Sequence, residues 1–262
     1  MTPAPKKNLS RRRWLKLGFF GTPAATLLDA FAVEPSWLRE RTFTVGGGRL
    51  GIQVAHFTDV HHKGDVDRLE TVVRRINASG SRYALFTGDL IEEREHLDEA
   101  LRILGGLQVP LIGVPGNHDH WSRAGLDRFR KGFETGGGRY LRDGSVRLEP
   151  GLEVVGLDHL HPHPPSRADD FQLLLVHYPA WADSVVPPTS GRRYDLVLAG
   201  HTHGGQVRLP GVGALVTPFD TGGYEMGWYE TASGPLYVNP GIGSLMADVR
   251  FLCRPEITYF RI

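Results

Sequence analysis

Five short apolar runs in this 262-residue sequence each end on side chains that can ligate a metal. Polar groups at the end of a buried strand are costly unless they are paired or bind a metal. Because every run delivers Asp, Asn or His, the pattern predicts a metal site at one edge of a sheet. The five ends follow residues 52–58, 83–87, 109–114, 171–176 and 196–199, and they are Asp59-Val60-His61, Gly88-Asp89, Gly116-Asn117-His118-Asp119, His177 and Gly200-His201-Thr202-His203.

The chemistry that these ligand types favour is hydrolysis of a phosphate ester. That reaction needs charge neutralisation on the phosphoryl oxygens, a hydroxide made from water, and stabilisation of the leaving oxygen. Two divalent ions about 3.5–4 Å apart provide the first two together. Ions so close need an anionic bridge, and Asp89 is the candidate because Gly88 lets the backbone turn sharply. The absence of thiolates from the pattern argues against a thiol-rich zinc site.

The five blocks, in this order, resemble the signature of the calcineurin-like metallophosphoesterases over residues 50–262. The resemblance implies that two divalent ions (Mn, Fe or Zn, the identity left open) are bound, with Asp89 shared between them. It assigns the ligands of one ion as Asp59, His61, Asp89 and His203. It assigns those of the other as Asp89, Asn117, His177 and His201.

The resemblance also implies two catalytic residues. His118, when protonated, would stabilise the phosphoryl oxygens or donate a proton to the leaving group. Asp119 would orient His118 and raise its pKa by placing negative charge nearby. A hydroxide that bridges the two ions would attack in line, without a covalent enzyme intermediate. The expected activity is therefore hydrolysis of a phosphodiester or pyrophosphate bond.

Longer segments resemble a bacterial envelope branch of these enzymes, whose members are often exported phosphodiesterases. The segments are residues 199–210, residues 237–243, and Arg250-Phe251 with residues 254–257. Some members cleave UDP-2,3-diacylglucosamine in lipid A synthesis. The resemblance thus implies a phosphodiester or nucleotide-sugar-lipid type of substrate, without fixing which one.

The first 32 residues are interpreted as an export signal. Residues 10–16, SRRRWLK, resemble the twin-arginine motif; a moderately apolar stretch follows, and Ala30-Phe31-Ala32 fits small-x-small cleavage. The resemblance makes the twin-arginine export machinery a partner and the periplasm or cell envelope the location. Two fates of the signal are left open: it is cleaved, or it is retained as a membrane tether that gives peripheral membrane association.

The elements that must position these residues follow from hydrophobic spacing. Helical spacing occurs over residues 66–78, 97–107 and 123–133, between the first predicted strands, which is typical of an α/β sheet. Short strands follow, including residues 206–209, 215–217, 227–230, 236–239 and 257–262. We expect a four-layer α-β-β-α sandwich of two mixed sheets flanked by helices, with ligands at the carboxyl ends of strands. Residues 33–48 are interpreted as a linker and residues 49–262 as the catalytic domain.

Composition narrows the partners. Residues 1–32 contain six basic side chains and one acidic one, which leaves 24 basic and 28 acidic side chains in the remainder. This mildly acidic body lacks the footprint of a general nucleic-acid binder, so no stable nucleic-acid partner is expected. The single cysteine, Cys253, excludes an intrachain disulfide and is interpreted as a buried apolar residue.

Several alternatives stay open at this point. The protein could be a phosphomonoesterase, or a non-catalytic envelope-binding protein with a phosphoesterase-like fold. Arg208 and Arg250 either bind a second phosphate or are ordinary ion-pair residues. The apolar side chains of residues 211–228 either form a lipid-facing rim or are strands of the second sheet. A metallo-β-lactamase-type site is excluded because the sequence contains no His-x-His-x-Asp-His run.

Overall fold

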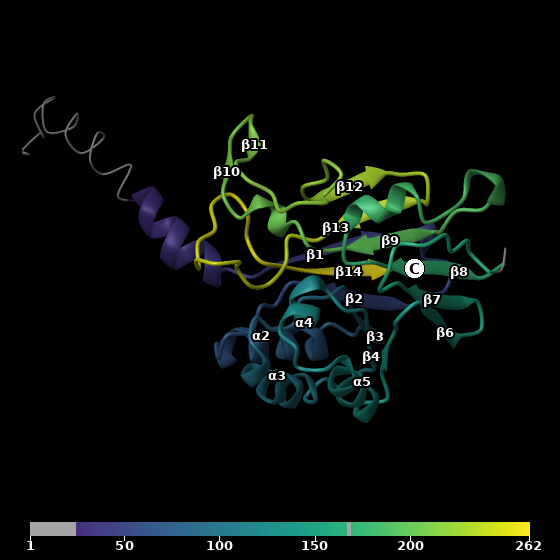
Figure 1. Ribbon diagram of the computed structural model, residues 1–262, viewed down its shortest axis with the longest axis horizontal. Helices are drawn as coiled ribbons and strands as arrows, with labels where there is room; N and C mark the ends of the chain where they lie inside the picture. The colour runs from purple at the N-terminus through teal and green to yellow at the C-terminus, as the bar shows by residue number, and fades with distance from the viewer. Residues whose placement is uncertain (1–24, 167–168) are drawn as a thin grey trace, which may run out of the picture.

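The computed structural model describes residues 25–166 and 169–262, and it contains two six-stranded sheets that pack face to face (Figure 1). The twin-arginine motif at residues 10–16 lies outside the described residues. Within the described part of the chain, no helix is long and apolar enough to cross a membrane.

The first sheet supplies the strand ends of the first three blocks. Its inner pairs β2–β3, β3–β4 and β4–β5 are parallel, and β14 is antiparallel to β2 but parallel to the edge strand β1. Its strands, in spatial order, are β1 (Arg39–Thr44), β14 (Glu256–Arg261), β2 (Gln53–Phe57), β3 (Tyr83–Phe86), β4 (Leu111–Gly113) and β5 (Arg139–Tyr140). Helices α2 (Val66–Ala78), α3 (Leu97–Leu104) and α5 (Leu126–Thr135) cover its outer face (Figure 1).

The second sheet supplies the strand ends of the last two blocks. Strands β7, β8, β9 and β13 run parallel, and the edge strands are antiparallel to their neighbours. Its order is β12 (Gly227–Glu230), β13 (Pro235–Val238), β9 (Leu196–Ala199), β8 (Phe171–Leu175), β7 (Leu152–Gly156) and β6 (Gly144–Glu149). A 3-10 helix, η5 (Pro179–Asp183), and adjoining loops pack on its outer face, so this outer layer is thin.

Three apolar layers hold the sandwich together. The middle layer lies between the sheets and contains side chains with no exposed surface, such as Val54, Leu85, Leu173 and Leu198. The other two lie under the helices of the first sheet and under η5. Strands buried on both faces explain why the sequence shows continuous apolar runs rather than alternation.

The α/β class with two mixed sheets flanked by helices is confirmed, and the helix predicted over 66–78 has those bounds. Two local expectations are wrong. Residues 215–217 are not a strand; the neighbouring strands are β10 (Arg208–Leu209) and β11 (Gly213–Ala214), which form a separate hairpin. Residues 33–48, expected as a linker, contain β1, because Arg39 and Arg41 pair with the buried Glu256 at the sheet edge.

Residues 25–33, which precede β1, form a helix whose last part is η1 (Asp29–Val33). The 3-10 turn η2 (Glu34–Ser36) follows it. Ala30 is buried, and its carbonyl oxygen accepts a hydrogen bond of 2.9 Å from the backbone N–H of Arg250. The Ala30-Phe31-Ala32 segment therefore lies in a helix that contacts the body of the protein.

Candidate metal-binding active site

The predicted site residues lie in loops that leave the carboxyl ends of β2, β3, β4, β8 and β9, at one edge of the sandwich. Five of the seven predicted ligands have left-handed backbone angles: Asp59, His61, Asp89, His201 and His203 have φ between 44° and 71°. Non-glycine residues adopt this region at a cost, and such strain concentrates at functional sites. The local backbone is thus bent so that these side chains face one another.

Three glycines allow the loops to approach this closely. A Cβ at Gly88 would lie 2.7 Å from His177 Nδ1, and a Cβ at Gly200 would lie 2.3 Å from Asp59 Oδ2. A Cβ at Gly116 would lie 2.2 Å from Asp89 Oδ1. At each of these three positions, a side chain would collide with a neighbouring loop, so glycine is required there whatever its effect on its own turn.

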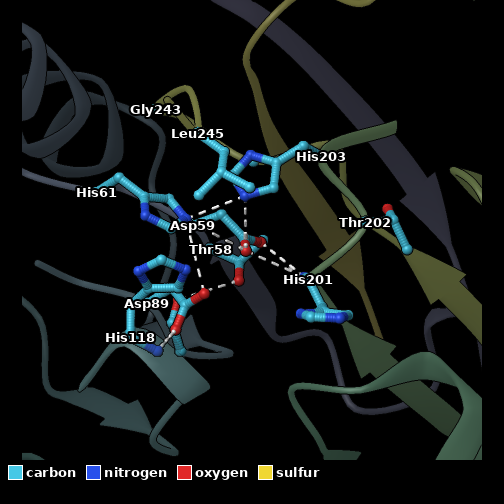
Figure 2. A network of polar contacts seen from close by, with 12 residues as sticks. Thr58, Asp59, His61, Asp89, His118, His201, Thr202, His203, Gly243 and Leu245 are labelled. Atoms are coloured by element: carbon cyan, nitrogen blue, oxygen red, sulfur yellow. Dashed lines mark hydrogen bonds and ion pairs between the residues drawn. The ribbon is translucent and has the colours of Figure 1, made fainter. Parts of the chain in front are cut away.

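Asp59, His61 and His203 form a first cluster (Figure 2), with ligand atoms within 4.8 Å of one another. The two imidazole Nε2 atoms are 3.0 Å apart, and His203 Nε2 is 3.5 Å from Asp59 Oδ1. Asp89 Oδ2 lies 3.6 Å from His61 Nε2. The backbone N–H of His201 donates to both Asp59 oxygens, which fixes this carboxylate.

Asp89, His177 and His201 form a second cluster, which Asn117 completes. His177 Nε2 lies 3.2 Å from Asp89 Oδ2, 2.9 Å from Asn117 Oδ1 and 3.2 Å from His201 Nδ1. The same Asp89 oxygen therefore belongs to both clusters. The structure brings all seven predicted ligands together, with Asp89 at the centre.

The donor set of the second cluster demands a cation. His177 Nδ1 faces the carbonyl oxygen of Thr87, and His201 Nε2 faces that of Phe219, so these two nitrogens carry the ring protons. His177 Nε2 then turns its lone pair toward the carboxylate oxygen of Asp89 and the amide oxygen of Asn117, and the lone pair of His201 Nδ1 faces His177 Nε2. Converging lone pairs repel unless a proton or metal ion lies between them.

The pKa values of the two histidines also indicate that this cluster binds a cation. Burial lowers the pKa of His177, but the charge and hydrogen bond of Asp89 outweigh it and raise that pKa to about 9. Burial and the neighbouring His177 lower the pKa of His201 to about 4. One buried proton on His177 is a poor substitute for a divalent ion, because it reaches a single acceptor. The residues present therefore fit a bound divalent ion at this cluster.

His118 stands beside the clusters with a partner that sequence reasoning missed. Its Nδ1 is 2.8 Å from Glu92 Oε2, while His61 Nδ1 is 2.8 Å from Glu92 Oε1. Burial lowers the pKa of His118, but the hydrogen bond to Glu92 and the charge of Asp89 outweigh it and raise that pKa. The backbone N–H of His118 donates to Asp89 Oδ1 at 2.7 Å. The only sequence signal for Glu92 is its place three residues after Asp89.

Asp119 has a different role from the one expected. Its carboxylate accepts hydrogen bonds from the backbone N–H groups of Asp89, Leu90 and Gly116, at 2.8–2.9 Å. The expectation that Asp119 orients the His118 side chain is corrected, because consecutive residues of a helix point about 100° apart and Glu92 holds that ring. Asp119 instead joins the loop after β3 to the start of α4 (Asn117–Trp121).

A cavity of about 680 Å³ opens over the two clusters. Asp89, Asn117, His118, His201 and His203 line it, and its other lining residues are mostly apolar or aromatic. Among the described residues that line it, none is Lys or Arg. The size suits a small-molecule site, and the lining suits a ligand with apolar parts.

The two arginines with open roles are both engaged within the protein. Arg208 pairs with Glu225 at 2.7 Å. Arg250 is fully buried and donates to the carbonyl oxygens of Pro240, Gly243 and Cys253. Cys253 is buried, as expected.

The fold and the site define the class of the protein. The sequence profile described as Calcineurin-like phosphoesterase matches residues 52–205. The chain therefore belongs to the calcineurin-like phosphoesterase family, and its paired His/Asp clusters have the composition of divalent-metal sites.

Two relatives that are similar in sequence have names that agree with this class. "Uncharacterized metallophosphoesterase YkuE" of Bacillus subtilis is 33% identical, with 98% of both chains covered. "Phosphodiesterase YaeI" of Escherichia coli is 36% identical over 42% of this chain and 41% of its own. A solved structure titled "Structural and Functional Characterization of a Novel Archaeal Phosphodiesterase" has a TM-score of 0.46 at 14% identity, covering 74% of this chain and 88% of that one.

Proposed function

We propose that this protein hydrolyses phosphodiester or pyrophosphate bonds with two divalent ions held around Asp89. The observation that carries the proposal is that one carboxylate oxygen of Asp89 is shared by two ligand clusters, with His118 adjacent. When bound, the ions would neutralise the phosphoryl oxygens and activate the attacking water. They would be held by Asp59, His61, Asp89 and His203 on one side, and by Asp89, Asn117, His177 and His201 on the other.

The protein's own groups account for the rest of the reaction. Glu92 holds His118 through Nδ1, which leaves Nε2 as the ring nitrogen available to a substrate in the cavity. Because Glu92 raises the pKa of His118, the ring retains a proton that it can give to the leaving oxygen as the P–O bond breaks. Water adds to phosphorus, and its proton replaces the one that His118 has donated.

The cavity favours a diester over a monoester. A phosphodiester carries one negative charge and two organic substituents, whereas a monoester carries up to two charges and one substituent. The lining combines apolar side chains such as Val216 and Phe219 with no Lys or Arg among the described residues, which suits the lower charge and the second substituent. The name of the YaeI relative, a phosphodiesterase, supports the same choice.

Hydrolysis of two chromogenic esters tests this function. The protein, reconstituted separately with Mn²⁺, Fe²⁺ and Zn²⁺, should hydrolyse bis-(p-nitrophenyl) phosphate faster than p-nitrophenyl phosphate. His118→Ala should lower kcat by about 10²–10⁴-fold while metal content stays unchanged. A monoester preference would replace the proposal with a phosphomonoesterase. Turnover by His118→Ala equal to that of the parent would refute the assigned role.

We also propose that the protein acts in the cell envelope after twin-arginine export. Support comes from Arg11-Arg12 and the apolar stretch that follows, in a chain whose folded site would be loaded before transport. Changing both arginines to lysine should retain the protein in the cytoplasm, as measured by fractionation and immunoblotting. Unchanged export of that variant would contradict this location.

A further inference from the structure

Three exposed apolar side chains line the cavity: Val216, Phe219 and Met246. Val212, Leu215 and Leu252 are also exposed, on the chain segments that adjoin them, and the six side chains together are here named the apolar rim. Phe219 is 92% exposed, Met246 91% and Val216 76%. Residues 209–219, which supply most of the rim, contain no charged side chain. Clustered exposed side chains of this size mark an interaction surface rather than ordinary surface scatter.

The rim is continuous with the N-terminal helix. Leu215 N–H donates to the carbonyl oxygen of Val207, and Arg208 N–H donates to that of Phe251. Arg250 directly precedes Phe251, and its backbone N–H donates to the carbonyl oxygen of Ala30. Figure 1 shows the β10–β11 hairpin, the segment before β14 and the helix of residues 25–33 at the same end of the molecule.

That helix adds further exposed apolar side chains at this end of the molecule. Leu27, Leu28 and Phe31 are each more than half exposed. The sequence that precedes it carries six cationic side chains between Lys6 and Lys16 and only apolar, small or hydroxyl side chains from Leu17 to Leu28. The mildly acidic body, by contrast, has no net positive charge with which to attract an anionic surface.

We propose that the apolar rim docks on a lipid bilayer, so that the mouth of the cavity faces the membrane. Apolar side chains that insert into the headgroup region and cationic residues that attract anionic lipid are the two signals that give stable peripheral binding. Here the helix of residues 25–33 adds exposed apolar side chains, and the cationic residues precede this helix in the sequence. A protein partner or a second copy of this chain would also use the apolar surface; a lipid bilayer is favoured because a cationic segment precedes the exposed apolar helix in the sequence.

Vesicle sedimentation tests the docking. The full chain should sediment with vesicles of phosphatidylcholine mixed with phosphatidylglycerol, and part of this binding should persist at about 1 M salt, where charges are screened beyond about 3 Å. The triple variant Val212→Ser, Val216→Ser, Phe219→Ser should bind about tenfold or more weakly at that salt. Leu160→Ser, at a residue that is 52% exposed but outside the rim, is the matched control and should bind as the parent does.

The other outcomes overturn the proposal. Equal binding of the triple variant would assign the membrane contact to the cationic stretch alone. The parent could instead self-associate on gel filtration and fail to bind vesicles. If the triple variant then lost this self-association, the rim would be assigned to contact with a second copy of the chain. A fluorescent label can be attached at V212C, because the native Cys253 is buried. Its emission should shift to the blue when vesicles are added, and this readout does not depend on the folding of the triple variant. Absence of a shift would refute docking.

Discussion

Gly116 offers a direct test of how tightly the site is packed, because a methyl group there would collide with the central carboxylate. The Cβ would lie 2.2 Å from Asp89 Oδ1 and 2.5 Å from Asp89 N, whereas carbon contacts are normally about 3.5–4.0 Å. Gly116 itself has φ −108° and ψ −178°, an extended conformation that alanine adopts freely. The whole cost of Gly116→Ala therefore comes from the collision.

The size of that cost follows from what must move. Asp89 has to shift by roughly 1 Å or more, and overpacking of this kind costs about 1–3 kcal/mol. The shift also strains the hydrogen bonds from His118 N–H to Asp89 Oδ1 and from Asp89 N–H to Asp119 Oδ2. Hydrogen bonds to charged groups contribute about 1.5–3 kcal/mol each, so loss of one brings the total to about 2.5–6 kcal/mol.

Urea unfolding and metal analysis measure the two consequences. Gly116→Ala should lower the free energy of unfolding by that amount and should retain less divalent metal after dialysis, measured by mass spectrometry. Gly144→Ala in β6 is the control, because no atom lies within 4 Å of its added Cβ, and it should change stability by less than about 0.5 kcal/mol. A Gly116→Ala protein with the parent's stability and metal content would refute the close packing described here.

Three further predictions concern the same site. Asp89→Asn should abolish binding of both ions, measured by titration calorimetry, while the control Asp67→Asn on α2 should bind ions as the parent does. Retention of one full ion site by Asp89→Asn would disprove that the two ions share Asp89. Glu92→Gln should move the alkaline limb of the kcat/KM profile to lower pH, because Glu92 raises the pKa of His118 and keeps it protonated as pH rises, whereas Glu93→Gln should leave the limb in place. Chelation should lower the melting temperature, since ion at 100 times its dissociation constant stabilises by about 2.7 kcal/mol, and an unchanged value would argue against bound metal.

The ligand blocks were predictable from sequence because each one follows a buried strand. Parallel strands deliver their carboxyl ends to one edge, so Asp59, Asp89 and His177 had to meet there once the sheets formed. The strand order itself was not readable, since no local pattern states which strands pair. The edge strand β1 was missed because only Phe43 among its six residues is a large apolar residue.

The groups that support the ligands were beyond sequence reasoning for a different reason. His177 and His201 donate to backbone carbonyl oxygens of Thr87 and Phe219, and every residue has a carbonyl, so residue type carries no signal. Glu92 is one of several acidic residues in its loop. Only the fold shows that it reaches both His61 and His118 while Glu93 remains exposed.

The backbone angles connect these supporting groups to metal binding. Left-handed angles at five non-glycine ligands cost about 1–2 kcal/mol each, so the total is comparable with the whole stability of a typical domain. Asp119, through three amide hydrogen bonds, and Asp59, through the N–H of His201, offset part of this cost without any ion. They hold converging lone pairs in position before a cation arrives. Since that arrangement is unfavourable for a merely structural core, the strain itself is an argument that the site binds divalent metal.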